Sequence, residues 1–388
     1  MISQCPQRPF ATAPRGVARR AVSLSGLAAA MVAASLLLAA CGGSSSSSSL
    51  TSSALTKAEV EDASGNISVV GWQFLDEPKV QDAGNVKSTW TYLGTEKDIY
   101  TKARSGQYDV LNATAATIEG LKRLNVLHPI NVSLLSDYDE LTPVVRDDAA
   151  WTDNGHVVAV PFAVSPSFTA WNSKQVPEPQ TLEDLLKPVY KSSIGLVGDP
   201  SVIEQIATAQ GVKNTAEMTE AQLNRVMAYL EKLKPNVKTF YQFGEEAQLF
   251  ARGEVKVLLQ GSGSYLSKVI ETVPSVKFNF LAENSYVEAW TLNSGQQEAA
   301  SLNWINRTLS QSGQEAIVKA SEAYPVNTKA LGALVKVGTP VAIATAKLSL
   351  PEILKNCPPA RGFSPESHGN VVGIEKVTRA WDDYQSSF

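Results

Sequence analysis

Short apolar runs alternate with segments of helical periodicity along residues 66–125. Runs rich in β-branched and aromatic residues predict strands at 66–72, 86–92 and 108–111. Apolar residues three or four positions apart predict helices at 76–83, 96–105 and 117–124. Strand followed by helix, three times over, is the pattern of an α/β layer fold with a largely parallel sheet.

A second α/β unit is predicted for about residues 163–289, because the segment 157–161 reads as a strand that leaves the first layer. Its clearest element is a helix at 221–234, in which Leu223, Val226 and Leu230 lie on one apolar stripe with Leu233. Further strands are predicted at 194–197, 255–259 and 278–281. Further helices are predicted at 200–210, 265–272, 296–311, 314–321, 342–348 and 374–384.

The first 40 residues have the composition of an export signal. They contain four arginines and no acidic residue, and they end in an alanine-rich apolar run at 24–40. The sequence Leu38-Ala39-Ala40-Cys41 resembles the lipobox of bacterial lipoproteins, which implies removal of residues 1–40 and lipidation of Cys41. An uncleaved anchor and an ordinary cleaved signal are the alternatives. The Ser-rich segment 41–65 then reads as a flexible tether.

The export route is left open. The pair Arg19-Arg20 allows twin-arginine export beside the general secretory route, although Val22 and Ser23 fit the twin-arginine pattern poorly. In either case an extracytoplasmic, lipid-anchored protein of the cell envelope is expected.

Composition is consistent with a large folded body, and it argues against nucleic acid and metal ions as partners. A chain of 388 residues exceeds what one hydrophobic core usually serves, so two domains are expected. Without residues 1–40 the chain has 30 basic and 38 acidic residues, which argues against binding to nucleic acid. The three histidines form no metal-binding motif, so no metal and no other cofactor is expected. Cys357 would stand alone, either as a reactive thiol or as a small buried apolar residue.

Six stretches of the chain form an ordered series: "VVGWQF" (69–74), "SGQYDVLNAT" (105–114), "AVPFAVSPSFTAWNSKQVPEPQTLEDLLKPVYKSSIGLVGDPS" (159–201), "LEKLKPNVKTF" (230–240), "ARGEVKVLLQGSGSY" (251–265) and "EAWTLNSG" (288–295). This series resembles the extracytoplasmic solute-binding proteins of ABC importers, in particular those of the spermidine/putrescine type. Together the stretches cover most of residues 66–330.

The resemblance implies a two-lobed α/β fold of the type II periplasmic-binding-protein class. Each lobe would be a mixed sheet flanked by helices, with the ligand in the cleft between them. Lobe one would comprise 66–162 and 290–330, and lobe two would comprise 163–289 and 331–388. The chain would be a monomer that captures a small solute by hinge closure and delivers it to ABC permease subunits in the membrane.

Candidate ligand contacts follow the predicted strands, because clefts in α/β lobes lie at the carboxyl ends of strands. Trp72, followed by Gln73, ends the first strand and by the resemblance would pack on an extended amine. Thr114 follows the third strand. Tyr286 and Glu288, two positions apart on a strand, would face the same side, one to stack on the ligand and the other to supply charge.

Of four further candidates, three have structural alternatives. Asp199 matches a family carboxylate that pairs with an ammonium, but it is equally suited to cap a helix that begins at Pro200. Gln260 and Ser262 belong to "QGSGS", a turn before a helix that suits simple capping or the cradling of an anion. Ser165 is the last candidate.

The polyamine pattern is incomplete, which leaves the solute open. Ala115 stands where the family usually has tyrosine, Val202 where it has a second acid, and Gln260 where it often has tryptophan. Glu204 lies near Val202 in sequence, but it is not expected on the same face. We therefore expect a polyamine or another small amine as the solute, and the alternative is an anionic or zwitterionic solute (a carboxylate, phosphonate or amino-acid-like compound) held by serines and helix N-termini.

Two other classes of function are weighed against the receptor. A hydrolase would need a nucleophile elbow, and "QGSGS" places glycine at the wrong offsets around Ser262, so no catalytic residue is expected. A structural adhesin would not need the paired α/β layers that the sequence predicts.

Overall fold

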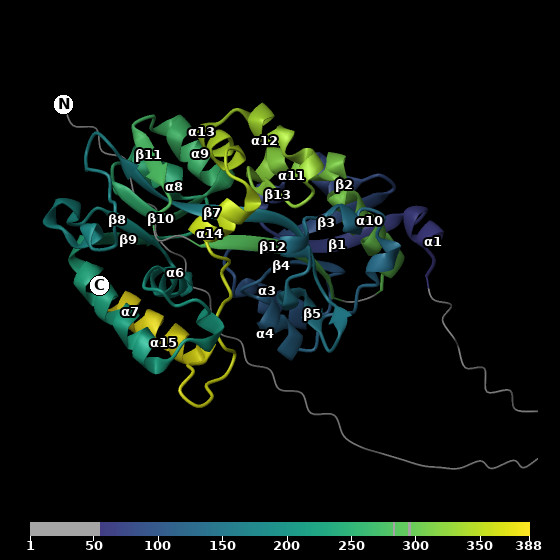
Figure 1. Ribbon diagram of the computed structural model, residues 1–388, viewed down its shortest axis with the longest axis horizontal. Coiled ribbons are helices and arrows are strands. Elements are labelled where there is room, and N and C mark those ends of the chain that lie inside the picture. The colour runs from purple at the N-terminus through teal and green to yellow at the C-terminus, as the bar shows by residue number, and fades with distance from the viewer. Residues whose placement is uncertain (1–54, 282–283, 294–295) are drawn as a thin grey trace, which may run out of the picture. The chain divides into compact units, whose positions relative to one another are not determined.

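The computed structural model describes residues 55–281, 284–293 and 296–388 (Figure 1). The predicted signal 1–40, Cys41 and most of the predicted tether lie outside the described residues. The strands are β1 (Gly65–Gly71), β2 (Asp82–Ala83), β3 (Val86–Tyr92), β4 (Val110–Thr114), β5 (Thr152–Asp153), β6 (His156–Val157), β7 (Val160–Asn172), β8 (Ile194–Val197), β9 (Val237–Tyr241), β10 (Val257–Ser262), β11 (Val276–Asn279), β12 (Ser285–Leu292) and β13 (Tyr324–Pro325). The α-helices are α1 (Lys57–Glu61), α2 (Pro78–Gln81), α3 (Asp98–Arg104), α4 (Ile118–Arg123), α5 (Pro143–Arg146), α6 (Ser201–Ala209), α7 (Glu220–Leu233), α8 (Glu246–Ala251), α9 (Gly263–Thr272), α10 (Glu298–Leu309), α11 (Gln311–Ser321), α12 (Gly332–Val337), α13 (Pro340–Ala346), α14 (Leu350–Asn356) and α15 (Ile374–Ser386). Among these described helices, none has the length and apolar character needed to cross a bilayer.

One long strand joins the two halves of the sheet. The first half of β7 pairs with β12 and β13, and its second half pairs with β10 and β11. The main path of the sheet therefore runs β2-β3-β1-β4-β12-β7-β10-β8-β9 without a break. All of β7 is buried except Ser165, which is partly exposed, as expected for a strand covered on both faces.

The sheet as a whole is mixed, and its strands from the predicted first unit are parallel as expected. These are β3, β1 and β4 in one half, and in the other half β10, β8 and β9 are also parallel. Between them β7 and β12 run antiparallel, because the chain crosses from the first half to the second along β7 and returns along β12. The mixed two-lobed architecture implied by the family resemblance is the one observed.

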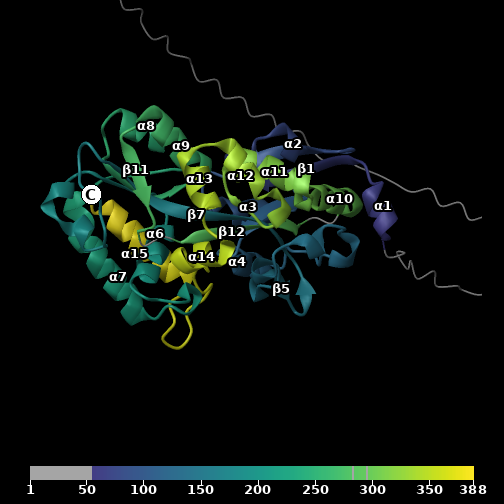
Figure 2. The same ribbon diagram turned by 45° about the horizontal axis from the view of Figure 1, so that its top comes forward.

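Two hydrophobic cores lie on either side of the crossing strands. The first contains buried side chains from 60–164 and 287–353, and we call the surrounding part lobe one. The second contains side chains from 168–281 together with the C-terminal helix, and we call that part lobe two. In Figures 1 and 2, α15 lies beside α7 in lobe two, and the two helices are in contact.

The C-terminal part of the chain is divided between the cores. The sequence assigned all of 331–388 to lobe two, but Leu334, Leu350 and Ile353 are buried in the core of lobe one. Trp381 and Tyr384 of α15 do belong to the core of lobe two. A short amphipathic helix packs its apolar stripe against the nearest sheet face. The sequence of the helix alone does not identify which sheet face that is.

The segment between α14 and α15 connects the lobes a further time. The Arg361 guanidinium donates to both carboxylate oxygens of Asp148 in lobe one, at 2.9 and 2.7 Å. The backbone N–H groups of Arg361 and Gly362 donate to Glu204 Oε1 in α6 of lobe two, at 2.6 and 2.8 Å. Gly362 also packs on the backbone of Ala116, so closely that a Cβ there would lie 2.2 Å from the carbonyl oxygen.

Gly362 should therefore tolerate no side chain. Its φ is +68°, and that of Gly369 in the same segment is +56°, but a Cβ at Gly369 would meet nothing within 4 Å. Both Ala variants suffer the left-handed backbone, which costs about 1–2 kcal/mol. Only Gly362→Ala adds the clash, so we expect it to unfold in urea with about 1–3 kcal/mol less stability than Gly369→Ala. Equal stability of the two variants would contradict this packing.

Candidate functional site

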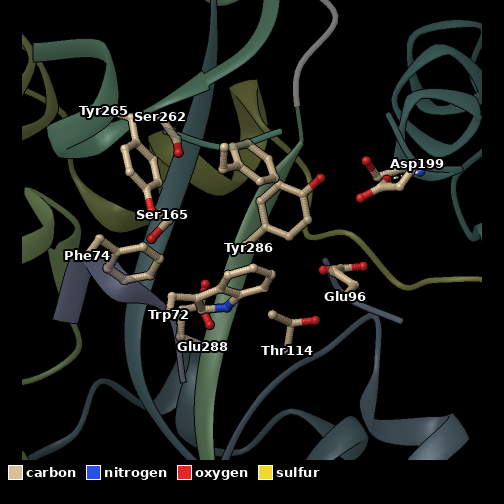
Figure 3. A pocket seen from close by; sticks show the side chains of 12 residues that line it. Trp72, Phe74, Glu96, Thr114, Ser165, Asp199, Ser262, Tyr265, Tyr286 and Glu288 are labelled. Atoms are coloured by element: carbon tan, nitrogen blue, oxygen red, sulfur yellow. Dashed lines mark hydrogen bonds between the residues drawn. The ribbon is translucent and has the colours of Figure 1, made fainter. Parts of the chain in front are cut away.

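A pocket lies between the lobes, where the crossing strands meet the loops of both sheets (Figure 3). The residues that line it are aromatic, acidic or hydroxyl-bearing, and among these described residues there is no lysine or arginine. They are Trp72, Phe74, Glu96, Thr114, Ser165, Asp199, Ser201, Phe243, Ser262, Tyr265, Tyr286 and Glu288.

The pocket is built at the carboxyl ends of parallel strands from both lobes. Trp72 directly follows β1, Glu96 lies in the loop after β3, and Thr114 ends β4. From lobe two, Asp199 follows β8 and Phe243 follows β9. The lining therefore comes from segments far apart in the sequence that the sheet order brings to one edge.

The crossing strands supply the floor. Glu288 of β12 is paired with Thr114 of β4, and Tyr286 of β12 is paired with Ser165 of β7. Cross-strand partners share a face, and residues two apart on one strand share it too. These four side chains therefore form one surface, and all of them line the pocket.

Aromatic rings from the two lobes meet across the pocket. Trp72 and Phe74 of lobe one lie edge-on to Phe243 and Tyr265 of lobe two, with ring centroids 6.4 and 6.2 Å apart. Phe243 and Tyr265 are themselves nearly parallel, at 6.2 Å. In Figure 3, Phe74 and Tyr265 lie to one side of Tyr286, while Glu96 and Asp199 lie to the other. The pocket thus has an aromatic side and an acidic side.

Glu288 is a buried carboxyl with one neutral partner. Its residue is 3% exposed, and its Oε2 accepts a hydrogen bond from Asn112 Nδ2 at 2.7 Å. Burial raises the pKa of Glu288 to about 8, and the Asn112 bond offsets only part of that shift. The group is therefore mainly protonated at neutral pH, until a cation enters beside it.

Glu96 and Asp199 form the acidic side of the pocket (Figure 3). Burial raises the pKa of Glu96 well above its ordinary value, and the negative charges of Asp199, Glu204 and Glu288 raise it further. Burial also raises the pKa of Asp199, against the opposing effects of hydrogen bonds from Ser201 and the charge of Lys97. In both cases the cost of holding negative charge away from water is the largest cause of the shift, and the opposing effects do not cancel it.

Asp199 lies one residue before Pro200, which is the N-cap of α6, so the predicted N-cap at Asp199 is displaced by one residue. Its Oδ1 accepts the backbone N–H of Ser201, the first residue of the helix, at 2.8 Å. The same side chain lines the pocket. The bond from Ser201 uses one carboxylate lone pair, which leaves the charge of the group available to a ligand.

Gln260 acts behind the lining. It stands at an irregularity in the β7–β10 pairing, with a φ of +63°, and it is buried. Its Nε2 donates to Ser201 Oγ and to the Tyr286 hydroxyl, both at 3.1 Å. A β-bulge redirects a side chain in this way, and a non-glycine residue with positive φ is often found near a binding site. Gln260 therefore orients two lining residues without lining the pocket itself.

The structure brings most of the predicted site residues together. Seven of them line the pocket, namely Trp72, Thr114, Ser165, Asp199, Ser262, Tyr286 and Glu288. Gln260 lies behind it, as described above. Gln73 does not belong to the site, because it begins the 3₁₀ turn after Trp72 with an exposed side chain.

Sequence reasoning missed five lining residues: Phe74, Glu96, Ser201, Phe243 and Tyr265. Glu96 was assigned to a helix that in fact begins at Asp98, so it lies in the loop after a strand, where the strand-end rule would have found it. Phe243 was missed because β9 was not predicted as a strand. Tyr265 was predicted as the first residue of a helix and was not considered as a ligand contact; it lies in the first turn of α9.

From the sequence, Glu204 was not expected on the ligand-facing surface. Its hydrogen-bond partners explain where it lies instead. It is 3% exposed, and its Oε1 accepts Thr215 Oγ1 at 2.6 Å in addition to the two backbone N–H groups of 361–362. Glu204 lines a neighbouring chamber and not the pocket described here. Its main contacts hold the 357–364 segment against α6.

Comparison with known proteins agrees with this geometry. The family model described as bacterial extracellular solute-binding protein matches residues 81–343. The chain belongs to this family. A spermidine/putrescine-binding periplasmic protein of Salmonella typhimurium is 23% identical over 185 residues, which are 46% of this chain and 52% of the relative. This solute-binding protein therefore spans about half the length of the curated relatives it matches.

Solved structures share the fold. The spermidine/putrescine ABC transporter substrate-binding protein PotD of Streptococcus pneumoniae superposes with a TM-score of 0.65 at 17% identity, covering 84% of this chain and 98% of that one. PBP AgtB of A. tumefaciens R10, in complex with agropinic acid, gives a TM-score of 0.56 at 18% identity, covering 83% and 96%. The resemblance to spermidine/putrescine-type solute-binding proteins is thus confirmed. The family is one of binding proteins, not a class of enzymes.

The raised pKa of Glu288 predicts how stability depends on pH in the ligand-free protein. An exposed glutamate in the unfolded chain ionises near 4.5, whereas Glu288 in the folded chain ionises at about 8. Between these values the folded state holds the extra proton, so the free energy of unfolding should fall as pH rises from 5 to 8. Glu288→Gln removes this group and should flatten the decline by on the order of a few kcal/mol. Urea titrations at pH 5 and 8 would measure it, and identical slopes in both proteins would contradict the assignment.

Proposed function

We propose that this solute-binding protein captures a small amine-bearing solute, such as a polyamine, in the interlobe pocket. The observation that carries the proposal is the convergence of Glu96, Asp199 and Glu288 on a pocket whose described lining contains no cation. An ammonium is the complement of such a site, because it supplies the missing positive charge and donates hydrogen bonds to the carboxylates.

The aromatic side of the pocket supports the same ligand class. Trp72, Phe74, Tyr265 and Tyr286 offer ring faces and edges to the methylene chain of an extended amine. A cation over an indole or phenol face gains about 0.5–2 kcal/mol, more when water is excluded. The ring contacts of Trp72 with Phe243 and of Phe74 with Tyr265 join the lobes, so a ligand held between them would favour the closed arrangement.

Delivery to a permease and anchoring by lipid complete the proposal. The family is extracellular, and relatives are named as components of ABC transporters. The basic, apolar and small residues that lead to Cys41 support lipidation at that cysteine, with the folded body held outside the membrane by the Ser-rich tether. A monomer would suffice, since both lobes of the pocket come from one chain.

An anionic or zwitterionic solute is the second candidate. It is supported by Ser262, which precedes α9 at the edge of the pocket and makes no capping hydrogen bond, and by the agropinic acid complex of a structural neighbour. A purely anionic ligand would meet three buried carboxyl groups, which disfavours it. A zwitterion would not meet that objection if its ammonium entered first.

Binding by variants separates these candidates. Glu288→Gln keeps the shape of the pocket and removes one negative charge, so we expect the affinity for spermidine or putrescine to fall by at least about tenfold. The matched control is Glu217→Gln, an exposed position in lobe two that should leave the affinity unchanged. Isothermal titration calorimetry would measure both. An unchanged affinity in Glu288→Gln, or a gain for an anion alone, would favour the second candidate.

Proton release should accompany amine binding. At pH 7 the Glu288 carboxyl, with its pKa of about 8, is mainly protonated, and an incoming ammonium favours the ionised form. Affinity should therefore rise between pH 6 and 8, by up to about tenfold per pH unit for each proton released. Calorimetry at pH 7 in phosphate and in Tris, whose ionisation enthalpies differ, counts the protons. The count should be positive in the wild type and smaller in Glu288→Gln, and a count of zero would contradict the mechanism.

A further inference from the structure

The pocket opens into a second, larger space between the lobes. This outer chamber shares Glu96, Asp199 and Ser201 with the pocket and continues between α3 and α4 of lobe one and α6, α15 and the 362–365 segment of lobe two. Its cavity volume is ≈ 420 Å³, against ≈ 50 Å³ for the pocket. Because a cavity needs about 10–15 Å³ to hold one water, the pocket admits only a few groups of that size. A ligand whose head fills the pocket must extend into the chamber.

The outer chamber adds basic side chains to the acidic ones of the pocket. Three basic residues line it: Lys97, at the start of α3, Arg104, at the end of α3, and Arg123, at the end of α4. Within the described part of the chain, none of the three forms an ion pair within 4.0 Å. Three acidic residues, Glu96, Asp199 and Glu204, line the same chamber, and the first two also line the pocket. Glu204 accepts three hydrogen bonds from its own surroundings, and Asp199 accepts the backbone N–H of Ser201.

Arg104 and Arg123 also suit the C-terminal ends of their helices, where positive charge complements the helix dipole. That role explains their presence on the two helices, but it does not require both to border one cavity. Arg146 and Arg361, by contrast, are paired with Asp147 and Asp148. Arg104 and Arg123, at the chamber, have no such ion pair in the described part of the chain, so their guanidinium groups can bind an incoming anion.

The walls between the two charged regions are largely apolar. Tyr100, Leu124, Pro200, Phe363 and Ile374 line the chamber between its acidic inner end and its basic outer part. Tyr100 is held in place by Gly120, whose missing Cβ would lie 2.4 Å from the ring. A hydrocarbon or amide spacer fits such walls, since it needs few polar partners.

We propose that the physiological ligand is amphoteric: an amine whose ammonium enters the pocket and whose other end carries a carboxylate or phosphate that binds Arg104 and Arg123 in the outer chamber. This inference rests on the proposed function, because it assumes that the pocket holds the ammonium. It departs from a simple polyamine, since a second ammonium that reached the part of the chamber lined by Arg104 and Arg123 would meet like charges there.

The test compares two ligands that differ only at the far end. Putrescine acylated on one nitrogen by succinate carries a free ammonium and a free carboxylate. The corresponding carboxamide has the same length and the same ammonium but no negative charge. We expect calorimetry at low salt to give the carboxylate an affinity at least about tenfold higher than the carboxamide in the wild-type protein. Spermidine serves as the reference ligand for the proposed function.

Two double variants identify the residues that recognise the carboxylate. Arg104→Gln with Arg123→Gln should abolish the preference for the carboxylate and leave the affinity for the carboxamide within about twofold. The charge-matched control, Arg252→Gln with Lys336→Gln, changes two exposed positions outside the chamber and should retain the preference. Thermal unfolding of each variant verifies that it is folded.

The outcomes distinguish this inference from the proposed function. Equal affinities for the two ligands in the wild type overturn the inference, and so does a preference that persists in the Arg104/Arg123 variant. If spermidine binds but neither acylated ligand does, the chamber does not accept the extension and the inference is again overturned, while the proposed function stands. If none of the three ligands binds, both proposals fail.

Discussion

The continuity of β7 is the constraint on which the other features depend. Both halves of the sheet form hydrogen bonds with this one strand, so the lobes cannot separate without bending β7 or its neighbour β12. The floor of the pocket, with Glu288, Tyr286, Thr114 and Ser165, lies on these crossing strands and on β4, and it should keep its shape when the lobes move. The walls, in contrast, come from loops that each lobe carries separately. A pocket with a fixed floor and movable walls can recognise a ligand before closure and enclose it afterwards.

Desolvation of carboxyl groups is the physical basis of the amine selectivity that we propose. Glu96, Asp199 and Glu288 all have raised pKa values because each is removed from water, and for Glu96 the neighbouring charges add to the effect. Ionised carboxylates are therefore less stable in this pocket than on a solvated surface, and a bound cation would relieve that cost. A neutral solute of the same shape would leave the cost in place. The proposed selectivity thus rests on the burial of these groups, before any individual hydrogen bond is counted.

The sequence predicted the site residues that follow clear strands and the residues at which some helices begin. Trp72 and Asp199 were found because they follow strands whose apolar runs are unambiguous, and the start of α6 was expected from the Asp-Pro pair to within one residue. Phe243 was not found, since β9 contains a lysine and a threonine in five residues and has no clear period. The division of the C-terminal helices between the cores was also out of reach. An amphipathic helix such as α14 has the same pattern whichever sheet face it covers, so only the three-dimensional packing decides.

In the structure, residues from other loops supply the residue types that are missing from the family pattern. Ala115 and Val202, which replace an aromatic and an acidic residue of the pattern, are both buried in hydrophobic cores, so neither position could serve a ligand in this chain. The corresponding chemistry comes from other loops: Phe243 and Tyr265 supply aromatic rings, and Glu96 supplies a carboxyl group. A binding pocket requires charge and rings at particular places in space, and several strand ends reach those places at the edge of one sheet. Residue types missing from one loop can therefore be supplied by a neighbouring one, which is why the site is more acidic and more aromatic than its motif suggests.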